Sequence, residues 1–162
     1  MSEKKYDVVV IGAGPGGYVC AIRAAQLGLS VACIEKENLG GTCLNVGCIP
    51  SKALLSASHK FEDAAEHMAD MGVEVSKPKL NLDRMMQHKT EVVDANTQGI
   101  GFLFKKNKVD HYVGNGEIQS ANIVKVTDAK GGETMLNTQS VVIATGSEVM
   151  PLPGIDIDEK DI

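Results

Sequence analysis

A strand pattern that runs straight into a glycine-rich turn constrains the fold of this chain more than any other feature. Residues 6–11, Tyr-Asp-Val-Val-Val-Ile, form a largely β-branched run typical of a parallel strand covered on both faces. The turn Gly12-Ala13-Gly14-Pro15-Gly16-Gly17 follows at once, and an Ala-rich helix is expected over 18–27, with Gly28 as its C-cap. A second strand over 30–35 completes a βαβ unit.

The glycine spacing in this turn is that of a dinucleotide-binding loop. Gly12 permits the tight turn, Gly14 lets the backbone approach a pyrophosphate, and Gly17 lets the helix pack on the strand. The helix N-terminus offers unpaired N–H groups to the phosphates. Glu35 ends the second strand, where its carboxylate can accept a hydrogen bond from a ribose 2′-OH. The alternative is a glycine-rich turn with a surface glutamate, and the spacing does not separate FAD from NAD.

Two helices are expected in the middle of the chain. Residues 36–49 predict a loop or a distorted helix start, and Pro50 suits a first helical turn. Helix-forming residues then run over 52–71. Asn81 predicts the N-cap of a long helix from residue 82 to about 106, whose last third is weakened by two glycines.

The last part of the chain is rich in strand patterns. Short strands are expected at residues 109–113, 116–119, 123–127 and 134–137, with a turn at Gly131-Gly132 and a separate buried strand over 140–144. The predicted fold class is therefore α/β: a Rossmann-like domain with a parallel sheet, flanking helices and a small antiparallel β-meander. This domain is expected over residues 1–150, and residues 151–162, which include Pro151 and Pro153, are expected to be an exit linker.

Composition excludes several classes of function. The chain has 162 residues, a length typical of one domain, and 16 basic against 21 acidic side chains give a net charge of −5. This charge argues against nucleic acid or an anionic membrane as the partner, because both need clustered cations. The longest apolar runs, at 8–11 and 141–144, fall far short of the ~20 residues of a spanning helix, and the N-terminus has no targeting pattern. We expect a soluble, cytoplasmic protein.

A pair of closely spaced cysteines predicts chemistry rather than a structural role. Cys43 and Cys48 lie within Gly40-Gly41-Thr42-Cys43-Leu44-Asn45-Val46-Gly47-Cys48-Ile49-Pro50-Ser51-Lys52. Their sulfurs could close a small disulfide ring if the backbone bends, and a helix N-terminus would favour the thiolate. Zinc would need further ligands, and no Cys/His pair is suitably placed, so no metal is expected. Two inert buried thiols are the other alternative. Cys20 and Cys33 are expected in the core.

The glycine loop followed by this cysteine segment resembles the flavin disulfide reductases. Among them, the sequence of residues 40–52 is most similar to the dihydrolipoamide dehydrogenase branch, and less similar to the glutathione and mercuric reductases. Three further segments support the resemblance: Gly114-Asn115-Gly116, Ala144-Thr145-Gly146-Ser147-Glu148 and Pro151-Leu152-Pro153-Gly154. The cysteine segment, residues 40–52, is highly specific for this family, whereas the other segments are shared widely among flavoproteins.

The resemblance implies an FAD site and a role for each matching residue. It makes Cys43 the thiol that exchanges with substrate, places Cys48 beside the flavin, and places Lys52 near the flavin ring. The remaining cofactor-binding residues that it implies are Gly12, Gly14, Gly16, Gly17, Glu35, Lys36, Gly40, Gly41, Thr42, Gly116, Ala144, Thr145, Gly146 and Ser147. Three alternatives stay open: a solvated helix lysine for Lys52, a hairpin-turn glycine for Gly116, and a strand-end turn for Thr145-Gly146.

The resemblance also implies an activity and partners for a larger parent enzyme. The parent would oxidise protein-bound dihydrolipoamide with NAD as acceptor, act on lipoyl groups of a 2-oxoacid dehydrogenase acyltransferase or a glycine-cleavage carrier protein, and form a homodimer. The family's NAD domain and His–Glu acid/base pair have no counterpart here, so we expect an N-terminal fragment that is inactive alone. The four histidines, His59, His67, His88 and His111, are expected in surface or packing roles. A stand-alone FAD- or nucleotide-binding module without turnover is the alternative.

Overall fold

The structure, a computed structural model, describes residues 4–148 and 150–155. The expected βαβ unit is present as β1 (Lys5–Ile11), α1 (Pro15–Gln26) and β2 (Val31–Glu35). The helix α1 begins three residues earlier than expected, because Pro15 occupies its first turn and Gly14 is its N-cap. Gly28 follows the helix with a φ of 90°, as a C-cap glycine requires.

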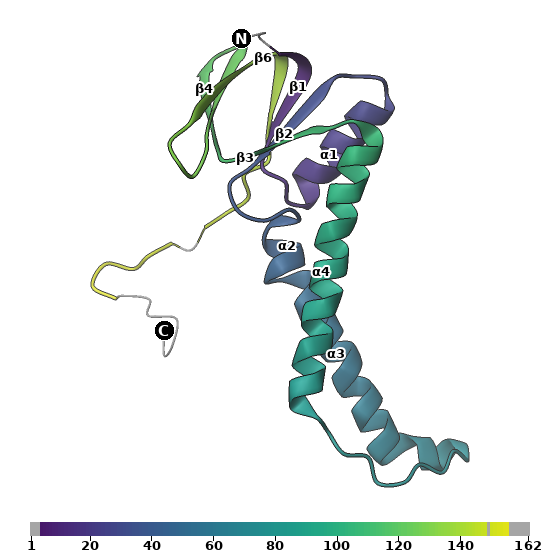
Figure 1. Ribbon diagram of the computed structural model, residues 1–162. Coiled ribbons are helices and arrows are strands. Elements are labelled where there is room, and N and C mark those ends of the chain that lie inside the picture. Colours follow the sequence, from purple (N-terminus) through teal and green to yellow (C-terminus); the bar gives the residue numbers. More distant parts are fainter. Residues whose placement is uncertain (1–3, 149, 156–162) are drawn as a thin grey trace.

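One mixed sheet of six strands contains both the parallel layer and the meander. Its other strands are β3 (Asp110–Val113), β4 (Asn115–Ser120), β5 (Ile123–Thr127) and β6 (Glu133–Ile143). The strand order is β3-β2-β1-β6-β5-β4; the first four strands are parallel, and β5 is antiparallel to both of its neighbours. Figure 1 shows β1, β2 and β6 ending beside α2. The α/β fold class and the antiparallel meander are confirmed.

The prediction of two separate strands over 134–137 and 140–144 was wrong. The strand β6 runs without a break, because its first part pairs antiparallel with β5 and its second part pairs parallel with β1. Asn137 belongs to both ladders, opposite Ile123 and Lys5. No turn is needed between the two parts, since one strand leaves the meander and enters the parallel layer.

Residues 41–51 are more helical than expected, and the helix after them changes its type along its length. Residues 41–45 form the short helix α2 (Gly41–Asn45), and α3 (Cys48–Glu62) begins at the second cysteine. The helix expected over 52–71 keeps α geometry only to Glu62 and continues as the π-helix η1 (Asp63–His67) and the 3-10 helix η2 (Met68–Met71). Gly72, with a φ of 80°, ends this helical path.

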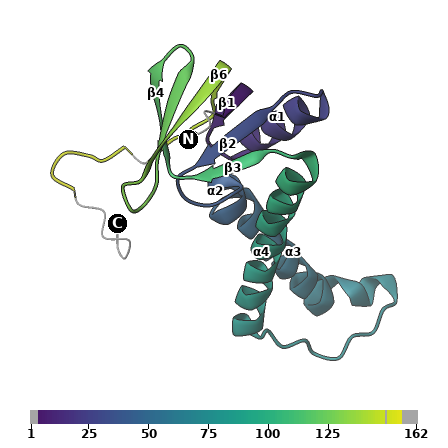
Figure 2. The ribbon, with the colours of Figure 1, turned by 45° about the horizontal axis from the view of Figure 1, so that its top comes forward.

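The long helix α4 (Leu82–Asn107) forms as expected. The Asn81 side chain accepts a hydrogen bond from the Arg84 backbone N–H at 3.0 Å, which confirms the N-cap. Its two glycines do not interrupt it, because Ile100 and Phe104 beside them are buried against the sheet core. Figures 1 and 2 show α3 and α4 running side by side away from the sheet.

Two apolar cores cover opposite faces of the parallel strands. One joins Val10 and Cys33 to Ala21 of α1 and Phe104 of α4. The other joins strand residues such as Val9 and Ile34 to side chains of the meander, among them Val124, Val126 and Leu136. The carboxyl ends of the strands are thereby held between two packed layers. In the described residues, no helix is long and apolar enough to cross a membrane.

A polar cluster closes the second core near the start of β1. The Tyr6 hydroxyl donates to Asp110 Oδ2 at 2.6 Å and lies 2.8 Å from the Tyr112 hydroxyl, and Lys4 Nζ donates to the same carboxylate oxygen at 2.9 Å. Burial, followed by the hydrogen bond to Asp110, raises the pKa of Tyr6 above its ordinary value. The hydrogen bonds from Tyr6 and Lys4 lower the pKa of Asp110. The cluster therefore favours neutral Tyr6 and ionised Asp110.

Tyr6→Phe is expected to lower the free energy of unfolding by about 1–2 kcal/mol at neutral pH, because Asp110 loses its closest donor. In the wild type, Tyr6 stays protonated while an unfolded tyrosine ionises near pH 10, so stability is fully present below about pH 10 and falls as the pH rises further. Tyr6→Phe should weaken this alkaline decline, measured by urea unfolding at several pH values. Tyr18→Phe, on α1 outside the cluster, is the control; an equal change in that variant would contradict the prediction.

Candidate functional site

A cavity of about 860 Å³ lies at the carboxyl ends of the parallel strands, next to the cysteine segment. It is lined by the ends of β1 and β2, the glycine loop, α2, and the segment after β6. This is the edge at which open α/β sheets bind ligands. Its volume lies within the range of about 300–1,000 Å³ that small-molecule and cofactor pockets occupy.

The glycine loop has no room for side chains where it meets the strands and the helix. A Cβ on Gly12 would lie 2.2 Å from the Ala144 carbonyl oxygen, and Gly12 has a φ of 100°. A Cβ on Gly17 would lie 1.8 Å from the Gly12 carbonyl oxygen. By contrast, a Cβ built on Gly14 or Gly16 would meet no atom within 4 Å beyond the adjacent residues and the backbone of its own helix. Gly12 and Gly17 hold the turn closed, and Gly14 leaves backbone exposed toward the cavity that it lines.

Glu35 is buried and fastens the glycine loop to the end of β2. Its Oε2 accepts a hydrogen bond from the Ala13 N–H at 2.7 Å, and its Oε1 accepts one from the Glu37 N–H at 3.0 Å. Only 9% of the residue is exposed, so the surface-glutamate alternative was wrong. A carboxylate offers about four lone-pair sites, and these two bonds leave acceptor capacity for a hydroxyl group.

Cys43 on α2 and Cys48 at the start of α3 lie close together. Both are free thiols in this structure; Cys43 is half-buried and Cys48 is exposed, and both line the cavity. The neighbouring Cys48 thiol raises the pKa of Cys43, and desolvation raises it further. The charge of Lys52 opposes this rise. The pair thus has the proximity that dithiol–disulfide chemistry needs.

The segment between the two cysteines is held by side-chain hydrogen bonds and by a close backbone approach. The Asn45 amide donates to the Leu39 carbonyl oxygen at 3.1 Å and to that of Gly41 at 2.9 Å. Gly47 is the N-cap of α3, and a Cβ there would lie 3.0 Å from the Thr42 carbonyl oxygen. The bend between the cysteines therefore depends on a glycine and on an asparagine amide.

The structure brings most of the expected site residues to this one cavity. Those that line it are Gly12, Gly14, Glu35, Lys36, Gly41, Thr42, Cys43, Cys48, Gly116, Ala144, Thr145, Gly146 and Ser147. Four expected residues are not among its lining residues: Gly16, Gly17, Gly40 and Lys52. Gly17 shapes the loop from behind, whereas Lys52 lines a separate groove between α3 and α4.

Gly116 has a packing role that the sequence did not reveal. It lies inside β4 rather than in a hairpin turn, so that alternative was wrong. A Cβ on it would lie 3.0 Å from a methyl carbon of Ile11 and 3.2 Å from Ile34 Cδ1. The missing side chain lets the meander approach the strand ends. Gly146, with a φ of 74°, follows β6 without a regular turn.

Several lining residues were missed by sequence reasoning. They include Pro15, Asn38, Asn45, Val46, Gly114, Asn115 and Glu148. Asn45 and Val46 stand between the two cysteines, and Glu148 follows Ser147 directly, so adjacency to the motifs was the signal available.

The effect of Cys48 and Lys52 on the pKa of Cys43 can be tested through the rate at which Cys43 is alkylated. Cys48→Ala removes the neighbouring thiol that raises the pKa of Cys43, so the pKa of Cys43 should fall and a larger fraction of Cys43 should be thiolate at neutral pH. We expect Cys43 to react several-fold faster with iodoacetamide near pH 8, followed by mass spectrometry. Lys52→Met should slow the reaction, because it removes the charge that lowers the pKa. A Cys43 rate that is unchanged in both variants would contradict the assignment.

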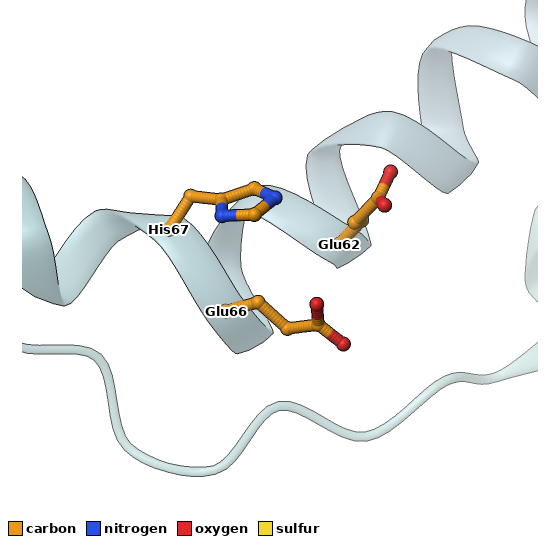
Figure 3. A group of neighbouring side chains, drawn as sticks. All are labelled: Glu62, Glu66 and His67. Atoms are coloured by element: carbon orange, nitrogen blue, oxygen red, sulfur yellow. The ribbon is translucent and has the colours of Figure 1, made fainter.

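The remaining cysteines and histidines lie away from the cavity. Cys33 is fully buried, and burial raises its pKa to about 12, while Cys20 packs against the same core. His59, His67 and His88 are exposed, and His111 packs edge-on against Phe104. His67, at the end of η1, lies close to Glu62 and Glu66 (Figure 3). All three side chains are exposed, and they form a surface cluster rather than part of the cavity.

Comparison with known proteins agrees with this geometry. Residues 6–162 match the family described as pyridine nucleotide-disulphide oxidoreductase. The chain belongs to this family. It is 58% identical over 158 residues to "Dihydrolipoyl dehydrogenase, mitochondrial" of Homo sapiens. The aligned residues are 96% of this chain and 31% of that relative. It is 56% identical over 161 residues to "Dihydrolipoyl dehydrogenase 3" of Pseudomonas putida, which covers 98% of this chain and 34% of that relative.

These relatives are about three times as long as the part that matches. The chain thus spans about a third of the length of the curated relatives it resembles. Within this disulphide oxidoreductase family, the matched part carries the glycine loop and both cysteines. The resemblance inferred from the sequence motifs is confirmed.

Proposed function

We propose that this chain is the FAD-binding, disulfide-carrying part of a dihydrolipoyl dehydrogenase. One observation carries the proposal: a single cavity joins the glycine loop at the end of β1 to Cys43 and Cys48. Membership of the family implies FAD, and the names of the relatives point to the dihydrolipoyl substrate. The expected domain of residues 1–150 and linker of 151–162 remain predictions; residues 1–3, 149 and 156–162 lie outside the described part.

The residues present fit an FAD-sized ligand at the phosphate end. Gly14 leaves open space where a diphosphate would approach the backbone, and α1, a helix of 12 residues, begins directly after it. Glu35 keeps acceptor capacity beside this loop for a ribose hydroxyl. Thr42 and Gly116 would line the rest of the ligand. The loop, the acid and the sulfurs then contact successive parts of one elongated cofactor.

The two cysteines are the groups that exchange with substrate. In the oxidised pair, a thiolate of the dihydrolipoyl group attacks the Cys43 sulfur; a mixed disulfide forms, and Cys48 leaves as a thiolate. The second substrate thiol then displaces Cys43, so that the substrate leaves as a cyclic disulfide and the protein keeps the dithiol. FAD, when bound, supplies the two-electron oxidation that returns this dithiol to the disulfide. Asn45 and Gly47 keep the sulfurs in reach of each other throughout.

The wider activity belongs to the same proposal. The parent protein would pass electrons to NAD, act on lipoyl groups of a 2-oxoacid dehydrogenase acyltransferase or a glycine-cleavage carrier protein, and work as a homodimer. The names of the relatives give the dihydrolipoyl substrate. The acceptor, the lipoyl-protein partners and the homodimer rest on the family resemblance of residues 40–52. A cytoplasmic location remains a prediction, since relatives named mitochondrial and a bacterial relative match equally well.

Isothermal titration of the purified chain with FAD tests the proposal. We expect one FAD per chain and retention of flavin absorbance after gel filtration, whereas FMN, which lacks the adenosine half, should not be retained. Absence of stoichiometric FAD binding, or equal binding of FMN, would overturn the assignment of this cavity.

A second assay addresses the expected inactivity of the chain alone. With dihydrolipoamide and NAD, we expect little or no NADH formation, because the chain corresponds to about a third of its relatives. Turnover near that of an intact relative would contradict this expectation and favour a complete catalytic unit. FAD binding without turnover leaves the FAD assignment intact.

A further inference from the structure

An ion pair joins two loops on opposite sides of the cavity. Lys36 follows β2 and Glu148 follows β6, and both line the cavity. The Lys36 ammonium donates a hydrogen bond to Glu148 Oε1. The two residues are 112 positions apart in the chain, so the contact exists only through the tertiary fold.

The order of the strands places this pair across the glycine loop. β1 lies between β2 and β6 in the sheet, and the loop that follows β1 contains Gly12 and Gly14. Two strand spacings separate β2 from β6 by about 10 Å, a gap that two long side chains can span. Both side chains remain substantially exposed, so the pair crosses the solvent side of the cavity rather than its floor.

We propose that Lys36 and Glu148 form a salt-sensitive clasp that crosses the cavity and slows the release of the bound dinucleotide. The inference rests on the proposed FAD site and adds a determinant that the glycine loop does not supply. With the clasp closed, the segment 144–148 is fastened to the loop after β2. With it open, Ala144 stays attached, because its N–H donates to the Ile11 carbonyl oxygen at 2.8 Å, and the bridge to the loop after β2 is lost for the residues around Gly146, whose φ is 74°.

A neighbouring carboxylate gives Lys36 a second partner when the clasp opens. Glu37 Oε1 lies 3.8 Å from Lys36 Nζ, within the same loop. This contact cannot join the two sides, because both residues follow β2. Glu148 therefore has a bridging role that Glu37 lacks, although both neutralise the same ammonium group. Lys36 also lowers the pKa of Glu148, so the carboxylate stays ionised at neutral pH.

The size of the effect follows from the exposure of the pair. Exposed ion pairs contribute little, so Glu148→Gln should speed FAD release by about two- to five-fold at low salt. Salt screens exposed charges, and at about 1 M KCl the wild type and the variant should release FAD at nearly equal rates. Glu37→Gln is the charge-matched control and should leave release unchanged or slower, because Lys36 loses only its competing partner.

The experiment follows FAD release from the loaded chain of 162 residues after dilution, with bound and free flavin separated by rapid gel filtration. Faster release in Glu148→Gln, abolished by salt and absent in Glu37→Gln, supports the clasp. Equal release in the wild type and Glu148→Gln at low salt, or the same acceleration in both variants, overturns it. A wild-type chain that retains no FAD overturns the proposed function as well, and is distinguished from failure of the clasp alone by the loading step.

A measurement on the chain without cofactor tests the ion pair itself. The carboxyl carbon of Glu148, followed by NMR during an acid titration, should show a higher pKa in Lys36→Met than in the wild type. An unchanged titration would remove the physical basis of the clasp, whatever the release rates. Urea unfolding of each variant shows whether a changed release rate reflects local opening or global destabilisation.

Discussion

Gly17→Ala is expected to abolish FAD binding and to lower the free energy of unfolding by about 3 kcal/mol or more. The added Cβ would lie 1.8 Å from the Gly12 carbonyl oxygen, a backbone atom that cannot rotate aside. The loop would have to move away from α1, and Gly12 itself has little freedom, because its own surroundings include the Ala144 carbonyl group. Urea unfolding and flavin retention after gel filtration measure the two effects.

Gly99→Ala is the matched control for this change. Gly99 also lies within a helix, α4, but a Cβ built there would meet no atom within 4 Å beyond the backbone of α4 and the adjacent residues. Alanine is the better helix former by up to about 1 kcal/mol, so Gly99→Ala should leave stability unchanged or increase it slightly. Equal stabilities of the Gly17→Ala and Gly99→Ala variants would show that the close approach of α1 to the loop is not rigid.

Cys43→Ser and Cys48→Ser are each expected to abolish intramolecular dithiol oxidation. With oxidised lipoamide in excess, the wild type should exchange two thiols for one disulfide and release dihydrolipoamide, so that two of its four cysteines remain free. A single remaining thiol can form only a mixed disulfide. We expect formation of dihydrolipoamide to fall about 100-fold or more, because the second sulfur no longer attacks within the same molecule.

Cys20→Ser serves as the control in this experiment. Cys20 packs against the core on α1, away from the cavity, so its loss should leave the exchange of two thiols intact. Thiol titration and mass spectrometry of the products distinguish the variants. Persistence of the two-thiol loss in Cys48→Ser would mean that Cys43 pairs with another sulfur and would refute the assigned pair.

Local patterns were sufficient where a short segment carries its own physical constraint. The β1–loop–α1 unit was predictable because the apolar strand, the glycine turn and the C-cap Gly28 are adjacent in the chain. The same holds for α4, since the cap at Asn81 is made by a residue three positions away. Cys43 and Cys48 were predictable as a pair because only five positions separate them.

Sequence reasoning was insufficient where a residue's environment depends on segments far away in the chain. The unbroken strand β6 was missed because it owes its two halves to β5 and β1, which no local pattern reveals. Gly116 was ambiguous because its close approach to Ile11 and Ile34 depends on how the meander folds over the sheet. Lys52 lines a groove between α3 and α4 rather than the cavity, although its charge acts on Cys43, and its expected place near the flavin ring stays a prediction.

The sequence by itself determined the chemistry of this protein: a glycine loop before a helix, an acid at the end of the next strand, and two thiols within one bend. These are short-range relations, and covalent geometry limits how neighbouring residues can be arranged. Only the tertiary structure decided that the loop, the thiols and the segment after β6 share one cavity, and that Lys36 reaches Glu148. The physical reason is that parallel strands bring their carboxyl ends to one edge, whatever the number of residues between them.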